Sequence, residues 1–121
     1  MTVSTERLLE VGETFAGLWD DADLAAVTPL YREDAVFISP NPPAISSEFG
    51  TTLTGRDEIL RYLGACLEMF GLGAMTTVGI FTGIDMLVLA WRGGDSFGAD
   101  VVHLDDDGLI VRHEVTSPNR S

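Results

Sequence analysis

The C-terminal part of the chain contains four apolar segments separated by turn-forming residues, and these constrain the fold most. The segments 75–82, 84–91, 96–104 and 109–116 are rich in Val, Ile, Leu and Thr, as expected of strands. The links between them are Gly83, "RGGD" and "DDDG", and short glycine-containing links are typical of antiparallel hairpins. The sequence therefore predicts four antiparallel strands after residue 74.

Helical periodicity precedes these strands. Apolar residues recur every three or four positions across 5–19 and again across 54–70, as on the buried face of an amphipathic helix. A short helix between them, capped by Asp20 or Asp21, is expected to carry Tyr31 at its end. The segment 34–39 ("DAVFIS") is predicted to be a strand.

The stretch 40–50 begins with three prolines in four residues and continues with small polar residues. This composition predicts a loop, placed at the rim of a pocket. Three helices and one early strand, followed by four antiparallel strands, indicate an α+β fold with helices on one face of a curved sheet. The length of 121 residues suits a single domain over 1–121.

Charge and composition exclude several classes of function. Nineteen acids against seven arginines, with no lysine, give a net charge of −12, which disfavours binding to nucleic acids or anionic membranes. The sequence contains no apolar run of the ~18 residues that a membrane helix needs and no signal-peptide pattern. The single cysteine, Cys66, cannot form an internal disulfide. We therefore expect a cytoplasmic protein that binds neither nucleic acid nor membrane.

Asp100 and His113 are polar residues at apolar positions of the last hairpin. Strand alternation places Asp100 on the face of Val102 and His113 on the face of Val115. A buried aspartate costs several kcal/mol unless it is paired or protonated. The "DDDG" turn brings residue 100 opposite a residue near 113, close enough for direct interaction. Either the two are ordinary polar residues with partners, or they move a proton in a pocket.

The segment 84–91 is apolar on both faces, and this bears on assembly. Met86 falls on one face, whereas Leu87, Leu89 and Trp91 fall on the other. We expect Met86 to face the pocket and the other three, with Val101, to form an outer apolar face. Because such a face needs a cover, the sequence predicts a homodimer through it.

Three segments carry a resemblance to a known family. They are "FAGLWDDADLAAVTPLYREDAVFISP", "LTGRDEILRYL" and "FGADVVHLDDDGLIVRHEV". In order and character they resemble the nuclear-transport-factor-2-like (NTF2-like) superfamily, particularly its ketosteroid isomerase and SnoaL-like polyketide cyclase branches. The resemblance implies a cone-shaped barrel, in which a curved antiparallel sheet wraps around three N-terminal helices and encloses a pocket.

Catalytic positions of ketosteroid isomerases are retained only in part. Ser39 stands where those enzymes have an aspartate base, and Phe15 stands where they have a tyrosine donor. Asp100 matches their second oxyanion donor, an aspartic acid kept protonated by apolar surroundings. Tyr31 matches a position where some relatives have a pocket tyrosine. Steroid isomerase activity is therefore not expected.

The cyclase and epoxide hydrolase branches place an acid on the last strand, where this chain has Val115. With the two histidines on opposite faces and no HxH or HExxH spacing, no metal or other cofactor is expected. The sequence predicts an enzyme that cyclises, isomerises or dehydrates a small apolar, oxygenated, polyketide-like molecule, with Asp100 as acid or base and His113 assisting. The residues expected to bind substrate are Tyr31, Ser39, Phe15, Tyr62, Met86, Val102 and Val115.

Two alternatives stay open at this point. A non-catalytic ligand-binding or dimerisation module could retain the same fold without its catalytic acids, since one fold hosts many functions. An epoxide hydrolase-like enzyme with altered catalytic residues is the other. An enzyme requires Asp100 to be accessible from the pocket, whereas a scaffold could fill the cone with side chains such as Phe15 and Tyr62.

Overall fold

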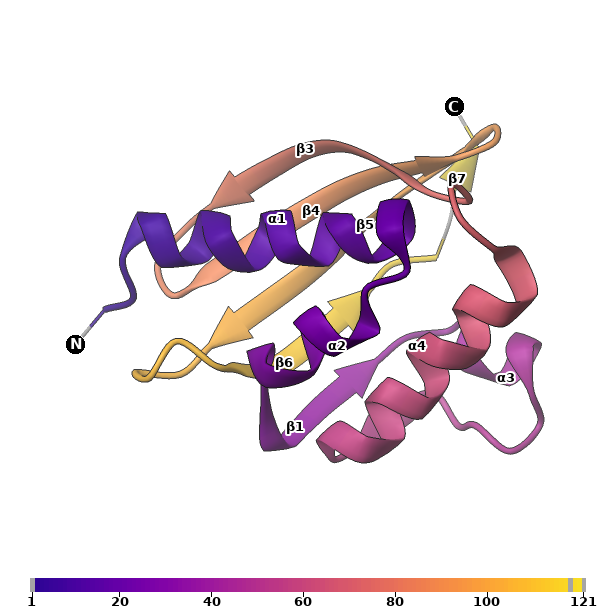
Figure 1. The fold of residues 1–121 in the computed structure, drawn as a ribbon, viewed down its shortest axis with the longest axis horizontal. Coiled ribbons are helices and arrows are strands. Elements are labelled where there is room, and N and C mark those ends of the chain that lie inside the picture. Colours follow the sequence, from indigo (N-terminus) through magenta and orange to yellow (C-terminus); the bar gives the residue numbers. More distant parts are fainter. Residues whose placement is uncertain (1, 118, 121) are drawn as a thin grey trace.

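The computed structural model of the chain describes residues 2–117 and 119–120. Helices alternate with strands in the first half, and strands follow one another in the second half (Figure 1). The helices are α1 (Thr5–Asp21), α2 (Leu24–Val27), the 3₁₀-helix η1 (Thr28–Leu30), α3 (Pro42–Ile45) and α4 (Arg56–Phe70). The strands are β1 (Tyr31–Ile38), β2 (Thr52–Thr54), β3 (Thr76–Thr82), β4 (Met86–Gly93), β5 (Ser96–Leu104), β6 (Ile110–Val115) and β7 (Asn119–Arg120).

The strands form one curved sheet in the order β2-β1-β6-β5-β4-β3, with β7 pairing with β5. The four antiparallel strands predicted after residue 74 are confirmed as β3 to β6. The expectation of a wholly antiparallel sheet is wrong at one pair, because β1 lies parallel to β6. Within the described residues, β2 and β3 are the two edges, so the curved sheet is not closed into a barrel.

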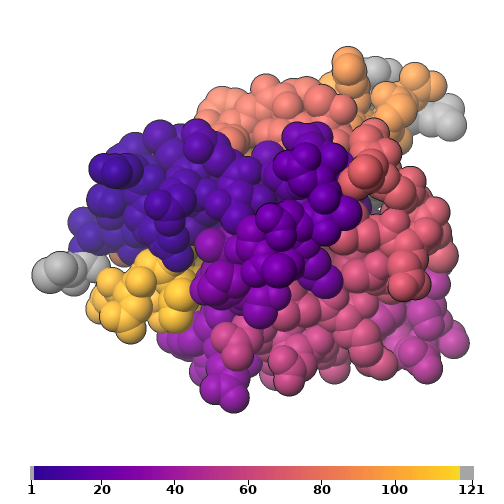
Figure 2. Space-filling view, in the orientation of Figure 1, coloured from indigo at the N-terminus to yellow at the C-terminus, as the bar shows by residue number. Residues whose placement is uncertain are grey.

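The helices cover the concave face of this sheet. Helix α1 packs against β3 and β4, and α4 packs against β1, so that together they conceal most of the sheet in Figure 2. Gly12 allows the close approach of α1, because a Cβ there would lie 2.9 Å from Cγ2 of Ile80 and 3.3 Å from Cδ1 of Leu87. This arrangement confirms the expected α+β fold, in which helices cover one face of a curved sheet. None of the described helices is both long and apolar enough to span a membrane.

Some element boundaries differ from those expected. Tyr31 begins β1 rather than ending the second helix, because Pro29 lacks a backbone donor and lies in a 3₁₀ turn. The helix expected from Thr54 begins at Arg56, since Thr54 pairs with β1 and Gly55 (φ 95°) precedes the helix. The proline-rich stretch expected to be a loop contains the single turn α3, with Pro42 at its start.

The faces of β4 are the reverse of those expected. Leu87, Leu89 and Trp91 point toward the helices and are 0%, 4% and 8% exposed. Leu89 lies opposite Asp100 in the register of β4 and β5, so the two share the inner face. Met86 lies opposite His103, on the outer face. The outer face is therefore not made of the leucines and Trp91.

Candidate active site

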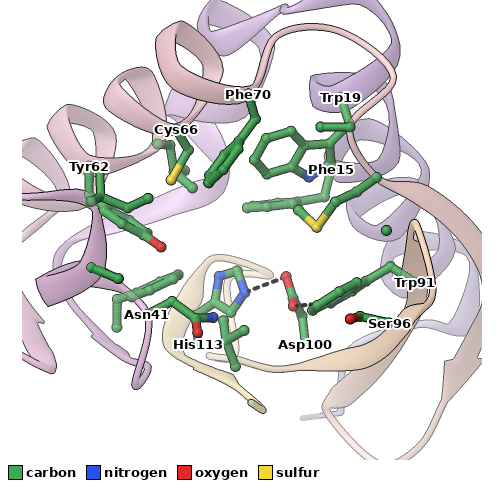
Figure 3. A pocket seen from close by; sticks show the side chains of 18 residues that line it. Phe15, Trp19, Asn41, Tyr62, Cys66, Phe70, Trp91, Ser96, Asp100 and His113 are labelled. Carbon is green, nitrogen blue, oxygen red and sulfur yellow. Dashed lines mark hydrogen bonds and ion pairs between the residues drawn. The ribbon is translucent and has the colours of Figure 1, made fainter. Parts of the chain in front are cut away.

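A cavity of about 410 Å³ lies between the inner face of the sheet and the helices. Figure 3 shows His113 and Asp100 on its sheet side, with Phe15, Trp19 and Phe70 across from them. The lining residues are mostly aromatic or aliphatic, namely Phe15, Trp19, Phe37, Ala44, Ile45, Tyr62, Leu63, Cys66, Phe70, Ala74, Met75, Trp91, Gly93 and Val115, with Asn41, Ser96, Asp100 and His113 as further polar or charged members. An apolar cavity with a few polar groups is typical of a small-molecule site.

Asp100 and His113 interact directly. Nε2 of His113 lies 3.0 Å from Oδ2 of Asp100. Asp100 lies opposite Val115 and His113 opposite Val102, so the pair is diagonal across the hairpin, within the reach of long side chains. Both side chains line the cavity. The aspartate is 14% exposed and the histidine 1% exposed, so the carboxylate is the more accessible group.

Tyr31 lies behind His113 and completes its hydrogen bonds. The phenolic oxygen of Tyr31 lies 2.7 Å from Nδ1 of the histidine. No other acceptor for this phenol lies among the described residues, so its O–H donates to Nδ1. Nδ1 therefore carries a lone pair, and Nε2 carries the proton that it donates to Asp100. The hydrogen-bond pattern thus directs the Nε2–H of His113 at the carboxyl group of Asp100.

Burial and charge keep the Tyr31 phenol protonated. Burial raises the pKa of Tyr31 well above its ordinary value, and the negative charge of Asp100 raises it further. A phenol that holds its proton is a permanent donor to Nδ1 of His113. The aromatic surroundings fix the imidazole as well, because ring centroids of Phe15 and Phe37 lie 5.1 Å and 4.7 Å from it in edge-to-face contacts.

Trp91 holds the other oxygen of the aspartate. Its Nε1–H donates to Oδ1 of Asp100 at 2.9 Å. The hydrogen bonds therefore run across four neighbouring strands. They lead from Tyr31 on β1 through His113 on β6 to Asp100 on β5. Trp91 on β4 donates to Asp100 from the opposite side. Two neutral donors thus stabilise the carboxylate, one at each oxygen. Trp91 was not among the site residues predicted from the sequence, because it was expected on the outer face of the sheet.

The residues expected to bind substrate fall into two groups. Phe15, Tyr62 and Val115 line the cavity, as do the catalytic candidates Asp100 and His113. The other four do not line it. Tyr31 contacts His113 from behind, Ser39 is buried and its Oγ accepts from the N–H of Asn41, Val102 is in the core, and Met86 is on the outer face.

The segment 40–50, expected at the rim of a pocket, contributes residues to the cavity wall. Asn41, Ala44 and Ile45 line the cavity. The Ser39–Asn41 hydrogen bond is 3.1 Å long and fixes the start of this segment. Asn41 is a polar lining residue that was not predicted from the sequence. Its position between prolines, in a stretch expected at the rim of a pocket, was the available signal.

Tyr62 and Cys66 form a second polar pair, on α4. Burial raises the pKa of Tyr62 far above its ordinary value, and the hydrogen bond with Cys66 adds to this. Burial also raises the pKa of the Cys66 thiol. Both groups are therefore neutral donors at neutral pH rather than nucleophiles. Among the residues that the structure describes, no three His, Cys, Asp or Glu side chains come together as around a metal ion.

Solved structures share this fold. A SnoaL-like protein of unknown function from Burkholderia thailandensis superimposes with a TM-score of 0.81 at 18% identity, covering 97% of this chain and 98% of the other. A suspected isomerase of the SnoaL-like family from Agrobacterium tumefaciens superimposes with a TM-score of 0.68 at 17% identity, covering 95% and 99%. An NTF2-like protein from Anabaena variabilis gives 0.73 at 15% identity, covering 100% and 96%. At these identities the likeness shows the fold alone.

Fold and cavity thus define an NTF2-like protein. Residues 11–113 match the SnoaL-like domain family, and the chain belongs to that family. No protein with a curated description matches the sequence. The resemblance noted from the sequence is therefore confirmed at the level of superfamily and family.

Proposed function

We propose that this protein is a cofactor-independent acid–base enzyme, an isomerase or cyclase, acting on a small apolar molecule that carries oxygen. The observation that carries the proposal is the position of Asp100. Its carboxylate lies at the wall of an apolar cavity, with one oxygen bonded to His113 and the other to Trp91. A carboxylate fixed in this way is suited to removing a proton from a carbon next to a carbonyl group.

The proposed reaction begins with proton transfer to Asp100. A free lone pair of its carboxylate accepts the proton from the substrate carbon, and the electron pair of the broken C–H bond moves into an enolate. In an isomerisation the enolate is conjugated with a neighbouring double bond and takes the proton back from Asp100 at another carbon. In a cyclisation the enolate carbon attacks a second carbonyl carbon, and the alkoxide that forms as the C=O π bond breaks takes the proton from Asp100. The donors of Tyr62 and Asn41, which line the same cavity, would hold the enolate oxygen.

Neutral lining groups support an uncharged substrate. Asp100 is the charged residue of the wall, and no arginine lines the cavity within the described residues. The aromatic side chains suit flat, apolar molecules. A polyketide-like molecule meets these requirements, and we propose it as the substrate class. We also propose a cytoplasmic location.

Hydrogen–deuterium exchange tests the proposed function without knowledge of the natural substrate. The ketone 2-tetralone is incubated with the protein in D₂O, and loss of its α-proton signals is followed by NMR. We expect exchange faster than in buffer, and a decrease of about 100-fold or more in Asp100→Asn. Asp95→Asn, which changes an exposed acid of the β4–β5 turn, is the matched control and should exchange at the wild-type rate.

The same experiment distinguishes an enzyme from a non-catalytic binding module. If wild-type protein binds 2-tetralone but exchanges its protons no faster than Asp100→Asn does, the protein binds ligands without this chemistry. Binding is followed by tryptophan fluorescence, since Trp19 and Trp91 both line the cavity. Equal exchange by wild type and Asp100→Asn would overturn the proposal.

We also propose that two copies associate through the outer face of β3 to β6. Phe81, which is 62% exposed, lies opposite Val88, and Val88 lies opposite Val101. Of the nineteen acids, these four strands contain only Asp100 and Glu114, and Asp100 faces inward. Glu114 pairs with Arg112. A face that is apolar and nearly free of net charge, on a strongly acidic chain, favours a second copy of the chain.

Sedimentation at micromolar concentration tests this assembly. We expect a species of twice the chain mass of 13.0 kDa, reduced to the monomer by Val101→Glu. A wild-type species of 13.0 kDa alone would overturn the proposal, and so would a dimer that Val101→Glu leaves intact.

A further inference from the structure

Gly98 lies directly opposite Trp91 in the pairing of β4 with β5. A Cβ atom built on Gly98 would lie 2.3 Å from Cζ2, 2.6 Å from Cη2 and 2.8 Å from Cε2 of the Trp91 indole. Real Cβ atoms do not approach other atoms so closely, so the indole occupies the space that a side chain at position 98 would need. The ring therefore lies across the backbone of Gly98.

This placement brings the indole nitrogen to Asp100. Residues 98 and 100 are on the same face of β5, and the ring that crosses Gly98 extends toward the carboxylate, where Nε1–H donates to Oδ1 at 2.9 Å (Figure 3). On the other side His113 holds Oδ2. With both oxygens bonded, the carboxylate cannot rotate without losing a hydrogen bond.

We propose that Gly98 and Trp91 form a positioning device for Asp100, in which the missing side chain of Gly98 lets the Trp91 indole lie flat and fix the carboxylate in the cavity. The catalytic purpose of this device rests on the proposed function, but its geometry does not. Gly98 has no left-handed backbone conformation to explain the choice of glycine. The space taken by the indole is the reason for it. Trp91 thus acts through Asp100 and is a positioning residue.

NMR of the ligand-free protein tests the device directly. The chain has two tryptophans, so two indole N–H signals are expected, and Trp91→Phe and Trp19→Phe assign them. In Gly98→Ala we expect the Trp91 indole N–H to exchange with solvent about fivefold to tenfold faster, because its hydrogen bond is lost. Trp19→Phe removes the other tryptophan of the cavity wall and should leave the Trp91 signal unchanged.

A readout at His113 separates positioning from packing. Loss of the Trp91 donor frees the carboxylate, so the His113 Nε2–H should also exchange about fivefold faster in Trp91→Phe, although Phe still fills much of the space. Gly98→Ala alone should also make the His113 Nε2–H exchange about fivefold faster. Added to Trp91→Phe it should have no further effect, because phenylalanine lacks the part of the indole that overlaps a side chain at position 98.

Two results would overturn the inference. The first is a Trp91 indole signal that Gly98→Ala leaves at wild-type exchange. The second is an equal effect of Gly98→Ala on His113 with and without Trp91, which would mean that the glycine acts through the backbone. Because these measurements need no substrate, they hold even if 2-tetralone is not turned over. Conversely, normal turnover with an insensitive Trp91 signal would remove the device and leave the proposed function standing.

Discussion

The phenol of Tyr31 and the carboxylate of Asp100 lie at opposite ends of one imidazole ring. Tyr31 Oη is 2.7 Å from Nδ1 of His113, and Asp100 Oδ2 is 3.0 Å from Nε2. Tyrosine at one end supplies a proton, and aspartate at the other end accepts one. The ring is therefore held in a single tautomer, with its proton directed at the carboxylate in the cavity wall.

Tyr31→Phe should release this tautomer. Without the donor, Nδ1 has no partner in a buried site, and ¹⁵N spectra of His113 should change from one tautomer, protonated at Nε2, to a mixture. The lost hydrogen bond should lower the free energy of unfolding by about 1 kcal/mol. A variant whose His113 spectrum matches that of the wild type would contradict the assigned proton direction.

Asp100→Asn and His113→Ala should affect proton exchange differently. We expect the asparagine variant to lose at least about 100-fold in α-proton exchange of 2-tetralone, and the alanine variant about tenfold, because the carboxylate remains when the histidine is removed. His113→Ala also leaves a cavity among aromatic rings, costing about 2–4 kcal/mol. His113→Phe is the control that retains a ring. A larger loss of exchange in His113→Ala than in Asp100→Asn would make His113 the principal base instead.

The two faces of β4 should differ in their contribution to stability. Leu87→Ala removes a fully buried side chain that packs beside α1, and should lower the free energy of unfolding by about 2–5 kcal/mol. Met86→Ala changes the neighbouring, outward-facing residue and should cost less. Urea unfolding at several protein concentrations separates any contribution of self-association. An equal or greater cost for Met86→Ala would contradict the observed faces.

The sequence was sufficient to predict the order of the longer helices, of β1 and of β3 to β6, and the pairing of Asp100 with His113, whereas α3, β2 and β7 were not predicted. Alternation is a strong signal where one face of a strand is polar, as in β6 with Arg112 and Glu114, and there it placed His113 inward. The family resemblance and the "DDDG" turn placed Asp100 beside it. In β4 alternation fails, because both faces are apolar, and the faces were assigned the wrong way round. The two-residue turn at 94–95 determines the faces of β4 through its register. Pairing of Gly93 with Ser96 places Leu89 opposite Asp100 and Trp91 opposite Gly98.

Other details depend on contacts that no local pattern contains. The pairing of β5 and β6 is irregular between His103 and Leu104, so that Leu104 lies opposite Ile110. Ile110 is therefore buried. Simple alternation from His113 predicts that Val111, rather than Ile110, points inward. The role of Tyr31 depends on the parallel pairing of β1 with β6, which joins segments about eighty residues apart. Such a pairing is decided by the packing of the whole sheet rather than by residues near Tyr31.

Alkaline pH should destabilise the protein through the same buried groups. Burial, followed by the charge of Asp100, raises the pKa of Tyr31 well above its ordinary 10.0, and burial raises the pKa of Tyr62 above the same value. In the unfolded chain both phenols ionise near pH 10, whereas in the folded protein both keep their protons. The folded state then binds more protons, so its stability is complete below pH 10 and falls as the pH rises further.

Urea unfolding between pH 8 and 11 measures this loss. Above pH 10 each phenol should contribute a decrease of about 1.4 kcal/mol per pH unit, and Tyr31→Phe should remove one such contribution from the slope. Tyr62→Phe is the matched variant and should remove the other phenol's contribution. Burial raises the pKa of Cys66 from 9.0, so the decrease in stability that this thiol contributes begins near pH 9, one unit below that of the phenols. Because Tyr31 and Tyr62 are the two tyrosines of the chain, tyrosinate absorbance should appear only as the protein unfolds. Tyrosinate absorbance in the folded protein near pH 10, or equal slopes for wild type and Tyr31→Phe, would show that Tyr31 is not the protonated donor that holds His113.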